Sequence, residues 1–258
     1  MYFCQFNLPG QNSIMYYSYV LPLIVAFAFI ITGDSYCQQP IDIEEKTLFS
    51  VAIDMNIQYY NQKAEQAFFD QDMERVEALF DSIVENVVKG TYLDNFTVNE
   101  YRSKKVSLHS FEKPIFLITY SDWYPFAPGE IAALNQIAAK HHRQIDFLVL
   151  FFNSRNRVRK YASKFNNKIH LLYADERANR FDRIIKSMKH SFGVPTVFYI
   201  DQDKKFLDVG RMPAHHFQDE FEASFFSKYN YFLNGISVFK IDGVGLHMAK
   251  KETPEKNQ

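Results

Sequence analysis

The chain has 258 residues, of which 47% are hydrophobic and 17% aromatic, so it carries enough apolar material for one or two domains with a packed core. Its 29 basic and 30 acidic residues give a net charge of -1, so no overall field attracts nucleic acid or an anionic membrane surface. The composition predicts a globular protein and gives no reason to expect either kind of binding.

The first predicted element is an N-terminal leader. The apolar run at residues 20–32 is shorter than the roughly 20 residues that a membrane span needs, and it fits the apolar core of a signal peptide. Ser35 and Cys37 place small residues at the minus-three and minus-one positions, which predicts cleavage before Gln38. Because no Lys or Arg precedes the run, residues 1–37 are expected to be a signal peptide or, alternatively, an uncleaved membrane anchor. Acylation of Cys37 is a further alternative.

Cysteine usage limits the chemistry of the rest of the chain. The sequence has two cysteines, Cys4 and Cys37, and no thiol occurs from Gln38 onward. Thiol-disulfide exchange proceeds by attack of a thiolate on a disulfide sulfur. The part of the chain that follows the leader therefore cannot carry out this exchange.

A helical extension is predicted at residues 38–90. Apolar residues recur there at spacings of three and four, which is the period of an amphipathic helix. We expect two helices, at about 44–69 and 72–89, with Gly90 ending the second. They are expected to pack on the following domain or on each other; the alternative is an arm that binds a partner or a second copy.

A second domain is predicted at residues 91–229, and it begins with a β-hairpin. Two short alternating runs at 96–99 and 105–108 flank a polar turn at 100–103. The following stretch, residues 113–130, reads as a buried strand at 114–120, a polar turn with Trp123 and two prolines, and the start of a helix at 126–142.

The remaining elements alternate between strand and helix. The pattern predicts strands at 145–152, 169–173, 193–201 and 205–210, helices at 154–165, 178–191 and 214–229, and a C-terminal tail at 230–258 whose charged end begins at Lys250. Alternation of this kind requires parallel strands joined by helical crossovers, and the last tight turn makes an antiparallel hairpin. The fold class expected is α/β, with a mixed central sheet flanked by helices and an N-terminal helical extension.

Four motifs resemble those of one family. They are the N-F-T-V and K-V-S-L runs of the hairpin, the Trp123 turn with Pro125 and Glu130, the helix E-I-A-A-L-N-Q-I-A at 130–138, and the block F-G-V-P-T-V-F-Y-I-D at 192–201. Together they resemble exported thioredoxin-like proteins of the TlpA and ResA type, over residues 92–226. The resemblance implies a thioredoxin-like fold. Family activity would be thiol-disulfide oxidoreduction by a C-x-x-C pair at the start of the first domain helix.

The two cysteine positions of that pair fall on Tyr124 and Ala127 in this sequence. A phenol with a pKa near 10 is a poor nucleophile at neutral pH and forms no disulfide, so no catalytic residue is expected here. We expect instead an apolar patch made by Trp123, Tyr124, Phe126 and Pro195, which is either a partner site or additional core.

A second implied feature is the family's cis-proline loop, which Val194, Pro195 and Thr196 resemble. The resemblance implies a cis Val194–Pro195 bond and a Val194 backbone that pairs with an extended peptide. The alternative is that Pro195 only shapes the loop.

Other groups give no second site in the sequence. The pairs His141-His142 and His215-His216 cannot each chelate a metal, because neighbouring helical residues point to different sides. The charged run at 175–183 is expected to be a solvated helix face, and the basic residues at 155–160 are too few to suggest nucleic acid. No glycine-rich phosphate loop or nucleophile elbow occurs, so no cofactor is expected.

The sequence thus predicts an exported, periplasmic domain that is not catalytic and that binds a peptide or protein. The alternative is an accessory component of periplasmic thiol-disulfide homeostasis that works beside an active oxidoreductase. A non-redox enzyme on this fold would need a cluster of acid and base residues that the sequence does not display. The expected partner is an extended peptide or a protein, membrane contact is limited to an uncleaved leader, and the oligomeric state stays open.

Overall fold

The computed structural model describes residues 46–179, 185–213 and 220–240. The predicted leader and its predicted cleavage site, the pair His215-His216 and the charged tail lie outside the described residues. Within those three ranges, no helix combines the length and the apolar character that crossing a bilayer requires.

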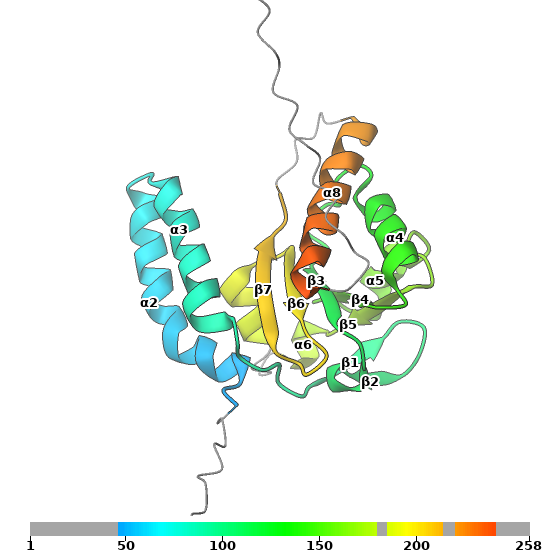
Figure 1. The fold of residues 1–258 in the computed structure, drawn as a ribbon, viewed down its shortest axis with the longest axis horizontal. Coiled ribbons are helices and arrows are strands. Elements are labelled where there is room, and N and C mark those ends of the chain that lie inside the picture. Colours follow the sequence, from blue (N-terminus) through cyan, green and yellow to red (C-terminus); the bar gives the residue numbers. More distant parts are fainter. Residues whose placement is uncertain (1–45, 180–184, 214–219, 241–258) are drawn as a thin grey trace, which may run out of the picture. The chain divides into compact units, whose positions relative to one another are not determined.

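A seven-stranded sheet with the order β2-β1-β5-β4-β3-β6-β7 forms the centre of the fold (Figure 1). The strands β3, β4 and β5 are parallel, whereas β6 and β7 run antiparallel and β1 pairs antiparallel with both β2 and β5. This confirms the mixed α/β sheet, the hairpin and the alternation expected from the sequence. The strands are β1 Thr97–Glu100, β2 Lys105–Ser107, β3 Ile115–Tyr120, β4 Asp146–Phe151, β5 Ile169–Tyr173, β6 Thr196–Ile200 and β7 Phe206–Arg211.

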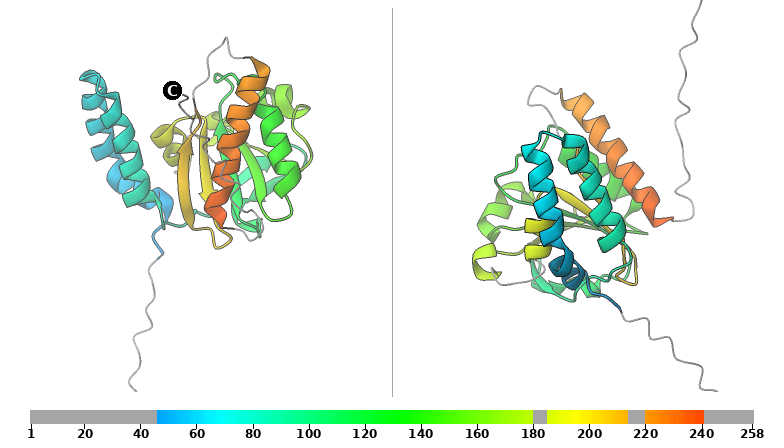
Figure 2. Two further views of the ribbon diagram at one scale, coloured as in Figure 1. Left: turned by 45° about the horizontal axis from the view of Figure 1, so that its top comes forward. Right: turned by 90° about the vertical axis from the view of Figure 1, so that its left-hand side faces the viewer.

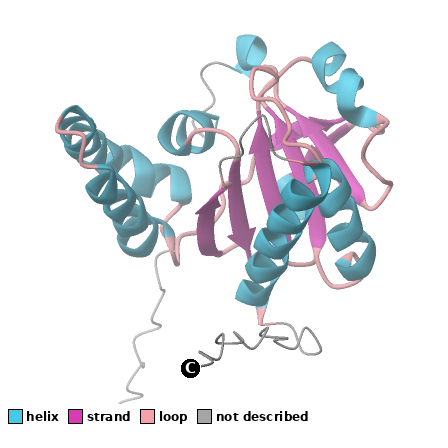
Figure 3. Cartoon of the chain, turned by 90° about the horizontal axis from the view of Figure 1, so that it is seen from above, coloured by secondary structure: helices cyan, strands magenta, loops and turns pink. Residues whose placement is uncertain are grey.

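Helices cover both faces of the sheet (Figure 3). The α-helices are α2 Phe49–Phe69, α3 Met73–Ile83, α4 Glu130–His141, α5 Arg155–Ala162, α6 Glu176–Asn179 and α8 Phe221–Ile236. The described residues also contain two π-helical turns, Val84–Val88 and Lys186–His190, and two 3-10 turns, Leu108–Ser110 and Ser237–Phe239.

Two hydrophobic layers result from the alternation of side chains along the strands. All six residues of β3 are buried, and Ile115 and Leu117 face one layer while Phe116 and Ile118 face the other. The first layer is covered by α2 and the turn Val84–Val88, and the second by α4, α5 and α8. In this second layer α4 and α8 lie side by side (Figure 2).

The N-terminal helices are docked at one end only. Phe49 is fully buried, and its ring stacks on Phe206 at 4.5 Å and meets Phe198 edge-on at 6.1 Å. This confirms that the extension packs on the following domain. The connecting turn lies away from the sheet (Figure 2), and Phe68, Phe69 and Met73 there are 68%, 83% and 54% exposed.

The last helix differs from the prediction. It begins at Phe221 and ends at Ile236, so the boundary expected at residue 229 falls inside it. Phe232 and Ile236 are fully buried in the second layer. Their packing stabilises the helix beyond residue 229. Gly235 is required within the helix because an added Cβ would overlap the Tyr199 hydroxyl.

Two other helices also differ from the expected ranges. The helix expected from residue 126 begins at Glu130, after Pro128 and after Gly129, whose φ of 75° marks it as outside the helix. The helix expected at 178–191 is helical at its described residues: α6 begins earlier, at Glu176, the π-helical turn spans Lys186–His190, and residues 180–184 lie outside the described ranges.

Candidate functional site

The candidate site lies at one edge of the sheet, where the parallel strands β3, β4 and β5 end. Ligands of α/β sheets bind outside the carboxyl ends of such strands. Because β6 runs antiparallel to β3 and pairs Thr196 with Thr119, its first residue lies at this same edge. We call this the carboxyl edge; it is formed by residues 121–129, 152–157, 174–177 and 189–195.

The turn after β3 presents one exposed aromatic side chain. Trp123 is 66% exposed and lies edge-to-face with the half-buried Tyr124 at 6.1 Å between ring centroids. The Tyr124 N–H donates to the Ser121 carbonyl at 3.0 Å, which closes the turn. The predicted patch residues Trp123 and Tyr124 thus lie together at the carboxyl edge.

Phe126 and Ala127 turn inward from the same segment. The Phe126 ring lies 4.5 Å from Tyr120 and 5.1 Å from Tyr161, in the second hydrophobic layer, and Ala127 is 4% exposed. The patch was expected to be either a partner site or additional core. Phe126 packs as additional core.

The loop before β6 contains a cis peptide bond between Val194 and Pro195, as the resemblance implies. The buried Thr196 hydroxyl lies within 3.2 Å of the Phe192 carbonyl and 3.0 Å of the Gly193 carbonyl, which fixes the loop to the strand. The Val194 side chain packs against the first layer. Within the described part of the chain, no hydrogen bond engages the N–H or the carbonyl of Val194.

A buried polar network underlies the Trp123 turn. Glu130, the first residue of α4, is 1% exposed; its carboxylate accepts hydrogen bonds from the Tyr120 hydroxyl and, at 3.1 Å, from the Ala127 N–H. Lys228 of α8, also 1% exposed, places its Nζ 4.0 Å from Glu130 Oε2 and donates to the Pro213 carbonyl. The network connects the turn to α4 and α8, two of the helices that cover the second layer.

Lys228 was missed in the sequence. The signal that could have identified it is a single cation on a helix face that otherwise carries Phe225 and Phe232, at spacings of three and four. A lysine in such a position needs a buried partner.

The two tyrosines nearest Glu130 are held in their neutral form. Burial raises the pKa of Tyr120 well above its ordinary value, and the charge of Glu130 raises it further. Burial, with a smaller contribution from Glu130, also raises the pKa of Tyr124. Tyr124 therefore stays a phenol at neutral pH, and a tyrosinate nucleophile at this position is disfavoured.

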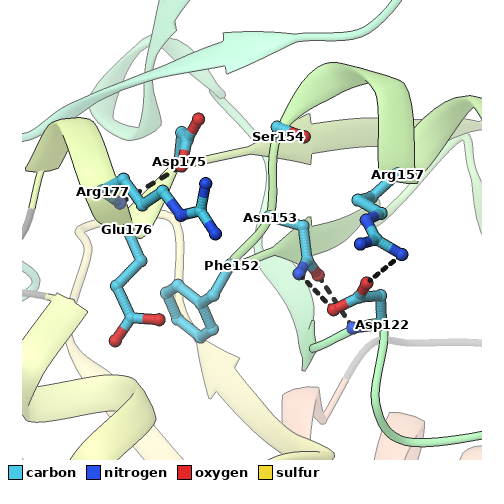
Figure 4. Close-up of a pocket in the computed structure, with 8 residues that line it drawn as sticks. All are labelled: Asp122, Phe152, Asn153, Ser154, Arg157, Asp175, Glu176 and Arg177. Atoms are coloured by element: carbon cyan, nitrogen blue, oxygen red, sulfur yellow. Dashed lines mark hydrogen bonds and ion pairs between the residues drawn. The ribbon is translucent and has the colours of Figure 1, made fainter.

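A polar cavity of about 240 Å³ opens beside the turn (Figure 4). It is formed by residues that follow three successive strands and by the first turn of α5: Asp122, Phe152, Asn153, Ser154, Arg157, Asp175, Glu176 and Arg177. We call it the polar pocket. Asp122 directly precedes Trp123, so the pocket and the exposed aromatic turn are neighbours on the carboxyl edge.

One side of the polar pocket is fixed by Asp122 and Asn153. The Asp122 N–H donates to Asn153 Oδ1 at 2.9 Å, and Asn153 Nδ2 donates to Asp122 Oδ1 at 2.6 Å. Arg157 Nη1 lies 3.3 Å from Asp122 Oδ2. These contacts connect the ends of β3 and β4 to α5.

The other side is formed by the segment after β5. The Arg177 N–H donates to Asp175 Oδ1 at 3.1 Å, and the Glu176 carboxylate pairs with Lys189 and, at 3.1 Å, with His190 Nε2. The hydrogen bond from Lys189 lowers the pKa of Glu176, against a smaller opposing effect of burial. In Figure 4 the Arg177 guanidinium extends toward Asn153, with Arg157 on the far side, and the Glu176 carboxylate is directed away.

The sequence did not predict this pocket. The segment from Asp175 was expected to be a solvated helix face, and Arg157 was noted only as one of the basic residues at 155–160 that are too few to suggest nucleic acid. The signal that could have revealed it is the polar residue or pair that follows each parallel strand: Asp122, Asn153-Ser154 and Asp175-Glu176.

Among the described residues, no group of three or more His, Cys, Asp or Glu side chains is placed to hold a metal ion. His142 contacts the Ala139 carbonyl at 3.0 Å through Nδ1. The pocket carboxylates are already engaged by Arg157, by a backbone N–H and by Lys189.

No family model and no curated protein sequence matches the chain. Among solved structures, a secreted Mycobacterium tuberculosis disulfide oxidoreductase homologous to E. coli DsbE is similar, with 18% identity over 53% of this chain and 96% of that chain and a TM-score of 0.39. A Chlorobium tepidum protein assigned as a thiol:disulfide interchange protein DsbE has 16% identity over 61% of this chain and 98% of that chain, with a TM-score of 0.43.

A Bacteroides fragilis thiol-disulfide oxidoreductase has 12% identity over 48% of this chain and 92% of that chain, with a TM-score of 0.40. Similarity at this level does not extend to activity. The thioredoxin-like character of the fold follows from the chain's own sheet: parallel β3 to β5, antiparallel β6 and β7, and a cis proline before β6.

Proposed function

We propose that this protein is an exported, thioredoxin-like binding module without a redox-active cysteine pair, and that it receives an extended segment of polypeptide at the carboxyl edge. The observation that carries the proposal is the cis Val194–Pro195 loop, whose Val194 N–H and carbonyl engage no described residue. A backbone donor and acceptor in extended chain can pair with another strand by β-augmentation.

The Trp123 turn supplies the second contact. A tryptophan that is 66% exposed on a folded surface offers a large apolar area, and such residues dominate binding energy at interfaces. Its neighbour Tyr124 is a protonated phenol, which can donate a hydrogen bond while packing against a ligand. The turn therefore suits contact with a polypeptide and not covalent chemistry.

Non-catalytic function is proposed because the positions of a C-x-x-C pair hold Tyr124 and Ala127, and no cysteine occurs after Cys37. In an insulin-reduction assay with dithiothreitol, the full chain is expected to reduce insulin no faster than the no-protein control. Catalysis above that control would contradict a non-catalytic module.

Binding is tested with a display library of random, tryptophan-free peptides selected on the full chain, followed by fluorescence polarisation with labelled peptides. Val194→Pro removes the N–H that pairs with the ligand and is expected to weaken binding at least tenfold. Val194→Ala keeps the backbone groups and is expected to change the affinity about threefold at most. Far-UV circular dichroism and thermal unfolding establish that each variant is folded.

The contribution of the aromatic turn is tested with Trp123→Ala. Loss of an interface tryptophan is expected to weaken peptide binding by tenfold or more. Phe69→Ala is the matched control, because Phe69 is 83% exposed and lies at the tip of the α2–α3 hairpin, away from the carboxyl edge. Equal effects of the two changes would place the peptide elsewhere.

The second candidate is an accessory role beside an active thiol-disulfide oxidoreductase of the periplasm. The resemblance of residues 92–226 to TlpA- and ResA-type proteins favours it, and the leader at residues 1–37 supports export, either as a cleaved signal peptide or as a membrane anchor. Affinity capture from periplasm distinguishes the candidates. Recovery of a cysteine-containing oxidoreductase favours the accessory role, and recovery of unrelated envelope proteins favours a general binding module.

A further inference from the structure

We propose that the polar pocket binds a carboxylate of the polypeptide, so that the module selects segments with an acidic group near the residues that pair with Val194; this inference rests on the proposed function. The pocket lies at the carboxyl edge and adjoins the Trp123 turn through Asp122. A chain bound along the edge would therefore pass its mouth.

The polar pocket has more unused hydrogen-bond donors than acceptors. Each carboxylate of the pocket already accepts: Asp122 from Asn153 and Arg157, Asp175 from the Arg177 N–H, and Glu176 from Lys189 and His190. The described residues provide no hydrogen bond or ion pair to the Arg177 guanidinium, which points into the pocket in Figure 4. The group that the pocket lacks is an acceptor.

Arg157 has donors left for a ligand as well. A guanidinium carries five N–H donors, and the contact of Arg157 with Asp122 joins one nitrogen to one oxygen at 3.3 Å. Two guanidinium groups on either side of Asn153 suit a planar, bidentate acceptor such as a carboxylate.

The start of α5 adds to this arrangement. Ser154 is its N-cap residue, and its side chain caps no backbone N–H of the helix. The hydroxyl lines the pocket together with the positive end of an eight-residue helix. Both features favour an anion at this position, in addition to the two arginines.

The volume and the charge of the polar pocket limit which anion it can bind. A cavity of about 240 Å³ is smaller than the roughly 300–1,000 Å³ of sites that enclose a whole small ligand, so it suits one group of a larger molecule. Asp122, Asp175 and Glu176 surround the arginines, and their charge disfavours a dianion such as a phosphate monoester. A singly charged carboxylate fits both limits.

The test uses the full chain and the selected peptides. We expect the wild-type selection to enrich Asp or Glu at a fixed position, and Asp→Asn or Glu→Gln at that position to weaken binding about tenfold. A peptide whose carboxylate is its own C-terminus is compared with its C-terminal amide. This arm shows whether a side chain or a chain end supplies the carboxylate.

Protein variants locate the effect. Arg177→Gln is expected to remove the preference, lowering the affinity for the acidic peptide about tenfold while leaving the amide peptide unchanged. Arg177→Lys is expected to retain part of the preference, because it keeps the charge and loses the bidentate geometry. Arg159→Gln is the matched control, since Arg159 is an exposed arginine of the same helix that does not line the pocket.

The outcomes separate this inference from the proposed function. The carboxylate inference alone is overturned if the selected peptides require Val194 and Trp123 but show no preference for an acidic residue. It is also overturned if Arg177→Gln leaves their affinity unchanged. Failure of the wild-type chain to bind any peptide overturns both. An equal loss with Arg159→Gln would show general charge attraction and not a pocket.

Discussion

Glu130 and Lys228 are the two most deeply buried opposite charges near the Trp123 turn, each 1% exposed. Transfer of a charge out of water costs several kcal/mol, so each requires the other and the surrounding hydrogen bonds. Since Glu130 accepts from the Ala127 N–H and the Tyr120 hydroxyl, the network fixes the segment that follows Trp123. Because no cysteine occurs after Cys37, we interpret this network as support for the turn.

We therefore predict that Lys228→Met, which leaves the Glu130 charge without this partner, lowers the free energy of unfolding by about 3–5 kcal/mol. Glu130→Gln in the same chain should recover part of that loss, giving a coupling energy of about 1 kcal/mol or more in a double-mutant cycle. Urea unfolding measures both quantities. The control is Lys160→Met at an exposed lysine of α5, expected to change stability by about 0.5 kcal/mol at most. Strict additivity of the two buried changes would contradict the coupling.

Glu176 allows a prediction about pH. Its pKa is lowered from 4.5 in the folded state, so its ion pair contributes stability that is complete above pH 4.5 and is lost as the pH falls through the folded value. Glu176→Gln should lower the unfolding free energy by about 1 kcal/mol or less at pH 7, because the pair is partly exposed. The difference from wild type should vanish at more acidic pH.

Urea unfolding over a series of pH values measures this effect, with Glu112→Gln as the control at an exposed position that has no ion pair with described residues. A difference that grows as the pH falls would contradict the direction of the pKa shift.

At the scale of elements, the α2–α3 hairpin combines a buried base with an exposed tip. Phe49 is enclosed by aromatic rings of β6, β7 and Phe192, whereas Phe69 is 83% exposed. The base accounts for the docking of the hairpin on the sheet. Whether the exposed tip binds a partner or a second copy of the chain stays a prediction.

Because Phe49 is buried and Phe69 is exposed, replacing each by alanine is expected to lower the free energy of unfolding by different amounts. Phe49→Ala is expected to lower the free energy of unfolding by about 3–5 kcal/mol, because it creates a cavity between the hairpin and the sheet. Phe69→Ala should change it by about 0.5 kcal/mol at most. Chemical denaturation of both variants checks the pair of values. Similar losses would mean that the tip is covered in the folded protein.

The sequence predicted the strands better than the helix ends, for a physical reason. Strands β3 and β4 are continuous apolar runs buried on both faces, a signal contained in the run itself. The end of α8 is decided by the packing of Phe232 and Ile236 on strands far away in sequence. The spacing of apolar residues within the helix gives no information on such contacts, so the continuation of α8 beyond residue 229 was not predictable.

At the scale of the whole molecule, the topology assembles a site from segments far apart in the chain. The Trp123 turn was identified from the sequence because it follows a buried strand, and the cis proline loop because residues 194–196 resemble a family motif. The polar pocket was not, because its residues follow three different strands and meet only when those strands lie in register. Its ion pairs join residues that are not neighbours in the sequence.

We propose that this thioredoxin-like sheet, in a chain without a cysteine after Cys37, has a polypeptide-binding edge. The chain contains one tryptophan, and this residue, Trp123, lies at that edge. Its emission is therefore a native probe of the proposed site. Titration of the full chain with a selected, tryptophan-free peptide should give a saturable shift of Trp123 emission to shorter wavelength, and Val194→Pro should abolish it. Peptide binding that saturates by polarisation but leaves Trp123 emission unchanged would contradict the account.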